Sequence, residues 1–154
     1  MRRGNHGQIV GNDPSVDPAR GTQMRHDAVA QQISQTGAVR AACLVTGLMV
    51  LGFAVLALMP VVPGLPSGAN DKLLHALGFA VLVVPMTLAR PMAAPGIWLA
   101  AVAYGLLIEI VQPYTGRMSE AADLMADALG AAAGILLAWT WLALWRMRRV
   151  IRQA

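Results

Sequence analysis

Charged residues are scarce in this chain, since only 13% of its 154 residues are Asp, Glu, Lys or Arg. A soluble domain has about 25%. The single cysteine, Cys43, excludes an intrachain disulfide. The sequence also lacks a phosphate-binding glycine loop, a closely spaced pair of zinc ligands and a strong nucleophile motif. The common signatures of nucleotide-dependent and zinc-dependent enzymes are therefore missing.

Hydrophobic residues make up 56% of the chain and gather in four stretches. Two of these stretches contain no Asp, Glu, Lys, Arg or His. Each of the other two contains a single such residue, His75 in one and Glu109 in the other. A helix that crosses a bilayer needs about 20 mostly apolar residues. We therefore predict an all-α fold, an integral membrane four-helix bundle. Its membrane domain covers residues 38–149, with spans at about 41–59, 72–89, 96–112 and 122–145.

The N-terminal segment differs in composition from the rest. Residues 1–37 are rich in Gly, Asn, Gln, Asp and Arg and show little apolar periodicity. Such a segment buries too little apolar surface to offset the entropy lost on folding. We expect a mostly disordered cytoplasmic tail, too long and too polar for the n-region of an ordinary signal peptide.

Basic residues are unevenly distributed around the predicted spans. Ten arginines flank the helix ends that would share one side of the membrane, whereas Lys72 and Arg117 lie on the other. Short flanking segments rich in Lys and Arg stay in the cytoplasm, so both termini are predicted to be cytoplasmic. Arginines beside membrane helices are explained by this topology and by anionic lipid, and no nucleic-acid partner is expected.

The other polar residues gather at the predicted outer ends of the helices. Spacings of three and four residues place many of them on shared helical faces. Charges that face lipid cost several kcal/mol, so acids within membrane helices usually face the bundle interior and have partners. We predict that these side chains converge in one outward-facing ligand-binding site. Its candidate residues are Asp71, Lys72, His75, Glu109, Gln112, Arg117, Ser119, Asp123 and Asp127.

Several of these features also have a purely structural explanation. Gly130 and Gly134 follow the small-xxx-small pattern that lets membrane helices approach closely, so we assign them to helix packing. Asp71 and Lys72 could simply cap a helix and mark the membrane interface. The whole polar cluster could lock the bundle without binding anything, and this alternative stays open.

The same motifs resemble those of the VanZ-like family. The stretches "DKLLH", "EIVQ" and "SEAAD" match an Asp-Lys-x-x-His motif, a Glu-x-x-Gln motif and a Ser-x-x-x-Asp segment before a Gly-rich helix. The resemblance covers about residues 38–146. One position departs from the family, which often has Asn where this chain has Asp127. The matching residues are Asp71, Lys72, His75, Glu109, Gln112, Gly116, Arg117, Ser119, Asp123, Gly130 and Gly134.

The resemblance implies a multi-pass protein of the bacterial cytoplasmic (inner) membrane with a role at the cell envelope. The founding member of the VanZ-like family is an accessory protein of glycopeptide-resistance clusters and is associated with teicoplanin resistance. The resemblance therefore also implies a link between this chain and glycopeptide resistance.

Three classes of function are compatible with the motifs. In the first, Arg117, Lys72 and His75 bind the phosphate or carboxylate of an anionic lipid or a lipid-linked cell-envelope precursor. In the second, the protein is a hydrolase or transferase acting on such a lipid. Its catalytic candidates are His75, paired with Glu109 or Asp123, and Ser119 as the hydroxyl nucleophile.

In the third class, the protein is a structural or partner-binding module whose partner is a second copy or another membrane protein. A transporter is a weaker alternative, because four spans are few and the polar residues cluster at one face. No cofactor is expected. No metal is expected either, because one histidine without a close second ligand is weak evidence for a metal site.

Overall fold

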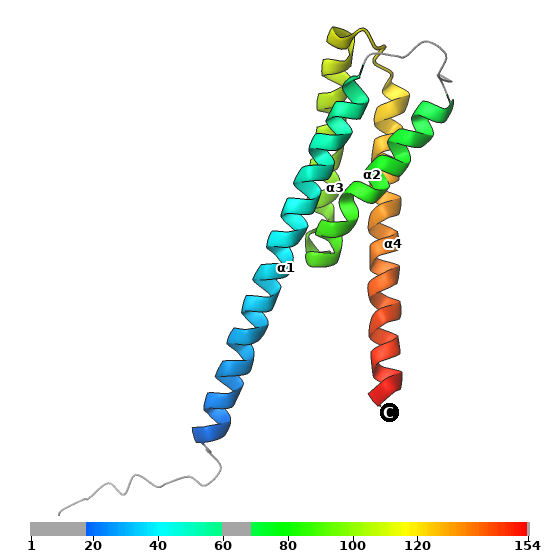
Figure 1. Cartoon of the computed structure of the whole chain (residues 1–154). Helices are drawn as coiled ribbons and strands as arrows, with labels where there is room; N and C mark the ends of the chain where they lie inside the picture. Colours follow the sequence, from blue (N-terminus) through cyan, green and yellow to red (C-terminus); the bar gives the residue numbers. More distant parts are fainter. Residues whose placement is uncertain (1–17, 60–68, 154) are drawn as a thin grey trace, which may run out of the picture. The chain divides into compact units, whose positions relative to one another are not determined.

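The computed structural model describes the backbone of residues 18–59 and 69–153. These residues form four α-helices and no strand, and Figure 1 shows how the helices run. They are α1 (Pro18–Leu58), α2 (Ala69–Ala89), α3 (Ala94–Val111) and α4 (Ala121–Gln153), with short 3-10 helices η1 (Pro91–Ala93) and η2 (Gln112–Thr115). All four α-helices are long and apolar enough to cross a membrane. The predicted all-α membrane fold is confirmed.

Internal contacts divide the chain into two units, Met1–Thr36 and Gly37–Ala154. In the first unit, the described residues form the N-terminal part of α1, whose side chains are exposed from residue 21 onwards. The expected disordered tail covers residues 1–37, but residues 18–37 are helical. Ala, Gln, Met and Arg in this stretch favour a helix, and proline is well tolerated at a helix start. Residues 1–17 lie outside the described part of the chain.

The last helix also differs from its predicted bounds. We expected the fourth span to end near residue 145, whereas α4 continues to Gln153. The sequence contains no glycine or proline after Gly134, and Leu, Met and Arg are good helix formers. Charge ends the apolar stretch in this region but does not end the helix.

Helices α2 and α4 pack closely in the second unit. A Cβ atom added to Gly130 would collide with the backbone carbonyl of Ala76, and one added to Gly134 would collide with that of Ala80. These are the two glycines assigned above to helix packing. The missing side chains let the backbones approach, as small residues commonly do in membrane helices. This contact sets the register of α2 against α4.

Aromatic rings connect α1 to the core formed by the other helices. The Phe53 ring of α1 meets the Phe79 ring of α2 edge to face, with centroids 5.0 Å apart. Room for Phe53 exists because Gly78 has no side chain, since an added Cβ would enter the Phe53 ring. Tyr104 of α3 donates a hydrogen bond from its hydroxyl to the carbonyl of Val50, 2.5 Å away. This layer lies beneath the polar side chains described below.

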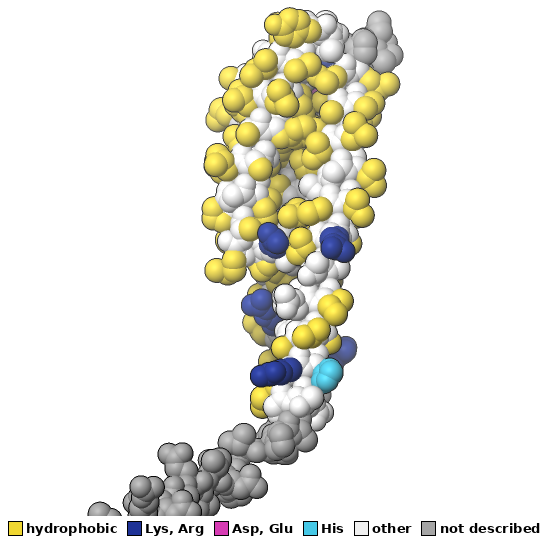
Figure 2. All heavy atoms as spheres, turned by 90° about the vertical axis from the view of Figure 1, so that its left-hand side faces the viewer, with side chains coloured by type: hydrophobic (Ala, Val, Ile, Leu, Met, Phe, Trp, Pro, Cys, Tyr) yellow, Lys and Arg dark blue, Asp and Glu magenta, His cyan; other side chains and the backbone are white. Residues whose placement is uncertain are grey.

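Many large apolar side chains point away from the core. Leu48, Leu74 and Leu137, for example, are 71%, 63% and 66% exposed. Figure 2 shows one face on which hydrophobic side chains cover the helical body and no acidic side chain is visible. Exposure of this kind is unfavourable in water but favourable against lipid tails. The chain is a multi-pass membrane protein.

Candidate functional site

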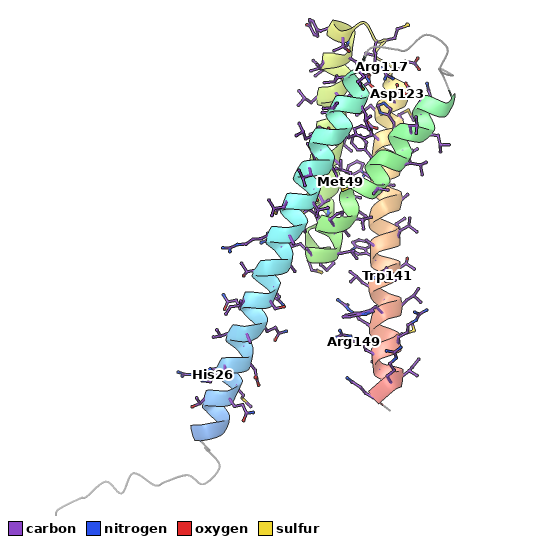
Figure 3. All side chains as sticks on the ribbon, in the orientation of Figure 1. His26, Met49, Arg117, Asp123, Trp141 and Arg149 are labelled. Atoms are coloured by element: carbon purple, nitrogen blue, oxygen red, sulfur yellow. The ribbon has the colours of Figure 1, made fainter. Side chains whose placement is uncertain are left out.

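The polar residues lie together at one end of the bundle. Because successive helices alternate in direction, α1 and α3 finish where α2 and α4 begin (Figure 1). We call this region the polar end. Figure 3 shows Arg117 and Asp123 there, whereas Trp141 and Arg149 lie farther along α4. Its side chains are those of Asp71, Lys72, His75, Glu109, Gln112, Arg117, Ser119, Glu120, Asp123 and Asp127.

A tight turn positions Arg117. Gly116 has a φ angle of 80°, in the left-handed region that favours glycine, and ends η2. The backbone N–H of Arg117 then donates to the carbonyl of Gln112 at 3.2 Å. The guanidinium Nη2 donates to Oδ2 of Asp71 at 2.6 Å. The side chains of Arg117 and Asp71 are 16% and 32% exposed, so this ion pair lies at the rim of the polar end.

Glu109 joins the end of α3 to the start of α4. Its Oε2 accepts a hydrogen bond from the Ser119 hydroxyl at 2.7 Å and another from the Glu120 backbone N–H at 2.9 Å. A carboxylate that accepts a backbone N–H at a helix start is well placed, because that end carries the positive pole of the helix dipole. Gln112 connects to α1 instead, with Nε2 donating to the Ala57 carbonyl at 3.3 Å.

Lys72 reaches across to α4. Its Nζ lies 2.6 Å from Oε2 of Glu120 and 3.6 Å from Oδ1 of Asp123. The side chains of Lys72 and Glu120 are 36% and 48% exposed, so water competes for both groups. Glu120 was not among the predicted site residues. The signal that could have identified it is its position three residues before Asp123, at the same helix start.

The deepest polar contact joins His75 to Asp127. The His75 Nδ1 and Asp127 Oδ1 atoms are 2.9 Å apart, and both side chains are buried. For the enzyme alternative we expected Glu109 or Asp123 as the partner of His75, whereas the structure pairs His75 with Asp127. The reason is the α2–α4 register, because Gly130 faces Ala76 and thereby places Asp127 opposite His75. Phe53 covers His75 edge to face, with ring centroids 5.5 Å apart.

Several buried oxygen atoms at the polar end have no hydrogen-bond partner among the described residues. Buried polar atoms in folded proteins are nearly always paired, so each exception is informative. Charge is also unbalanced, because five carboxyl groups share the polar end with one lysine, one arginine and one histidine. The unpartnered oxygens are Glu109 Oε1, Gln112 Oε1, Asp123 Oδ1 and Asp127 Oδ2.

The polar end therefore brings all the predicted site residues to one end of the bundle. Three groups of contacts lie there: Arg117 with Asp71; Lys72 with Glu120 and Asp123, to which Glu109 and Ser119 connect through Glu120; and His75 with Asp127. Gln112 contacts the Ala57 carbonyl instead. Asp71, His75 and Asp123 also offer one ligand atom each within 4.8 Å of one another. Ser119 donates to Glu109 and His75 contacts Asp127, so the described residues do not form a nucleophile–histidine pair.

Comparison with known proteins identifies the family. Residues 29–145 match the VanZ/LLP1 family, and this match covers most of the chain. The chain therefore belongs to the VanZ/LLP1 family. The expected VanZ-like assignment is confirmed. No match was found among curated proteins or among solved structures.

Proposed function

We propose that this VanZ/LLP1 protein binds the phosphate-bearing headgroup of an anionic lipid or a lipid-linked cell-envelope precursor at the polar end. The Arg117 side chain carries this proposal. Among the described residues its guanidinium has one hydrogen-bond partner, Asp71, and it uses only Nη2 for that contact. A guanidinium has five N–H donors in a planar fork that matches two phosphate oxygens.

Both basic side chains of the polar end can exchange their partners at little cost. Lys72 and Arg117 are held by Glu120 and Asp71, whose side chains are 48% and 32% exposed. Ion pairs with partly exposed partners contribute little, because water and salt screen them. A phosphate that brings two negative oxygens to Arg117 replaces one carboxylate contact with a bidentate one. The partly exposed rim is where a headgroup would enter.

Lipid is the expected source of this phosphate because of where the polar end lies on the helices. It occupies the ends of apolar spans, at the depth where lipid headgroups meet water. The distribution of basic residues supports an outward-facing polar end and cytoplasmic termini in a bacterial inner membrane. Reporter fusions after Arg90 and Arg152 test this orientation, and an outside signal from both positions would reverse it.

The test compares Arg117→Lys with wild type. The variant keeps the positive charge but loses the planar pair of donors, so we expect about tenfold weaker retention of anionic lipid. Native mass spectrometry of the full chain counts bound molecules of polyprenyl phosphate and phosphatidylglycerol, with phosphatidylcholine as the uncharged reference. The two anionic probes distinguish a lipid-linked precursor from an ordinary membrane lipid.

The matched control is Arg90→Lys. Arg90 is exposed between α2 and η1, outside the polar end, so this change should leave lipid retention unaltered. Equal retention by Arg117→Lys and wild type, at equal membrane abundance, would end the proposal that Arg117 anchors the headgroup. A loss in both variants would instead indicate nonspecific attraction between arginine and anionic lipid.

An enzyme acting on the same lipid is the second candidate. It is favoured by the buried pair of His75 and Asp127, because a carboxylate that orients an imidazole is the usual arrangement of a general base. Incubation of the purified protein with a lipid-linked phosphate should then release a water-soluble product, which His75→Gln abolishes. Absence of product from folded, lipid-binding protein would exclude this candidate.

A link to glycopeptide resistance is the most specific part of the proposal, and membership of the VanZ/LLP1 family is its support. A protein that binds a lipid-linked precursor would change the amount of that precursor to which a glycopeptide can bind. Deletion of the gene should therefore alter teicoplanin susceptibility, and expression of Arg117→Lys should not restore it. Unchanged susceptibility after deletion would rule out the link to glycopeptide resistance. The lipid-binding proposal would still be tested separately by native mass spectrometry.

A further inference from the structure

We propose that Asp71, His75 and Asp123 bind one divalent transition-metal ion, of the class of Mn²⁺ or Zn²⁺. Helix α2 contributes two of these residues and helix α4 contributes the third. Asp71 lies in the first turn of α2, His75 one turn later, and Asp123 in the first turn of α4. Their ligand atoms lie within 4.8 Å of one another. Ligands on opposite sides of an ion with bonds of about 2.1–2.4 Å are about 4–5 Å apart, so little rearrangement is needed.

His75 is oriented as a metal ligand commonly is. Its Nδ1 is engaged by Asp127 at 2.9 Å, and the ring nitrogen that remains is Nε2. Histidines that bind metals usually donate their other ring N–H to a carboxylate, which fixes the tautomer and the ring orientation. Asp127 supplies that carboxylate and is fully buried. Asp127 is thus a positioning residue, and the deep His75–Asp127 contact acquires a specific role.

Asp123 provides an independent observation that a ligand belongs here. The residue is 3% exposed, and its Oδ1 atom has no hydrogen-bond partner among the residues that the structure describes. The Lys72 ammonium lies 3.6 Å from that oxygen, beyond hydrogen-bond distance, and has a closer partner in Glu120 at 2.6 Å. A carboxyl oxygen buried without a hydrogen-bond donor is costly. A metal ion at this position would remove that cost.

The basic side chains around the three residues do not occupy all the carboxyl oxygens that a dication would need. Arg117 occupies Oδ2 of Asp71, so Oδ1 of that carboxyl group remains for a metal. Lys72 faces Asp123 from α2 and would turn toward Glu120 when an ion binds. The polar end contains five carboxyl groups and only two permanently charged basic groups. An ion of charge plus two would largely balance this excess of acid.

The donor set indicates the class of metal. Carboxylate oxygens suit Mg²⁺, Ca²⁺ and Mn²⁺, whereas imidazole suits Zn²⁺ and other transition metals. One imidazole with two carboxylates therefore favours Mn²⁺ or Zn²⁺ over Mg²⁺ and Ca²⁺. The inference does not depend on lipid binding, so it is tested in detergent without lipid.

The experiment measures Mn²⁺ binding to the purified full chain by electron paramagnetic resonance. We expect one bound Mn²⁺ per chain, with nitrogen modulation from a directly coordinated imidazole in the spin-echo spectrum. Asp127→Asn removes the carboxylate that orients His75 and should weaken binding about 10–100-fold. Asp123→Asn removes a ligand and should weaken it at least tenfold. Excess Zn²⁺ should displace Mn²⁺, and equimolar Mg²⁺ should not.

The control variant is Asp27→Asn, the same chemical change at an exposed position of α1 outside the polar end. It should bind Mn²⁺ like wild type. Absence of nitrogen modulation in wild type would overturn the proposal, and so would equal affinities of Asp27→Asn and Asp123→Asn. If Asp123→Asn fails to fold, which gel filtration reveals, the wild-type spectrum and Asp127→Asn decide the question.

Discussion

Replacement of Gly130 by alanine is the sharpest perturbation of the site that touches none of its polar side chains. An added Cβ would collide with the carbonyl oxygen, carbonyl carbon and Cα of Ala76 on α2. Carbon atoms in ordinary contact are about 3.5–4.0 Å apart, so the two helices must separate by roughly 1 Å. The colliding atoms belong to the backbone of α2, and no side chain can swing aside to relieve the contact.

The magnitude follows from two effects. Overpacking a close contact costs about 1–3 kcal/mol. A separation of roughly 1 Å also stretches the contact between His75 Nδ1 and Asp127 Oδ1 from 2.9 Å to beyond hydrogen-bond range. Loss of that hydrogen bond costs about 1 kcal/mol more. We therefore expect Gly130→Ala to lower the free energy of unfolding by about 2–4 kcal/mol.

The assay is unfolding in mixed micelles with increasing SDS, followed by the fluorescence of the four tryptophans. The matched control is Gly52→Ala on α1, where an added Cβ meets nothing within 4 Å. Because alanine favours a helix over glycine by about 1 kcal/mol, this control should be neutral or slightly stabilising. Equal midpoints for Gly130→Ala and wild type would refute the argument that backbone contact between α2 and α4 sets the His75–Asp127 pair.

Two further changes test other contacts of the same bundle. Tyr104→Phe keeps the ring but loses the hydroxyl that donates to the Val50 carbonyl, so the free energy of unfolding should fall by about 1 kcal/mol in the same assay. An unchanged midpoint would mean that this hydrogen bond does not hold α1 to α3. Glu109→Gln weakens the acceptor shared by Ser119 and Glu120, so it should lower the free energy of unfolding by about 1–3 kcal/mol. Full stability of this variant would show that Glu109 does not join α3 to α4.

The helices were predictable from sequence because the signal for a membrane span is local. A run of about 20 apolar residues identifies a span wherever its neighbours lie. The first predicted span, residues 41–59, ends one residue beyond α1, and the second, residues 72–89, lies within α2. The polar regions were harder to predict. Residues 18–37 have the composition of a solvated segment, yet their Ala, Gln and Met residues form a helix, and composition alone does not separate the two outcomes.

The convergence of the polar side chains could also be anticipated, but not their pairing. Lys72 and His75 share one face of α2, and Asp123 and Asp127 share one face of α4, so the sequence indicated which helices carry the polar groups. Whether His75 meets Asp123 or Asp127 depends on a shift of one helical turn between α2 and α4. That shift is decided by the Gly130–Ala76 contact, a tertiary feature without a local signal.

A bundle lock and a ligand site place different demands on buried oxygen atoms. A polar network that serves only to lock helices is stable when every buried acceptor has a donor, since a partly satisfied network is worse than an apolar core. The Glu109 carboxyl group meets this demand with one oxygen, and the other has no partner within the described ranges 18–59 and 69–153. Asp123 and Asp127 each leave one buried oxygen in the same state. Three carboxyl groups that each leave a buried oxygen without a donor do not make a stable lock, and the Asp123 oxygen among them is an acceptor that a cation can use.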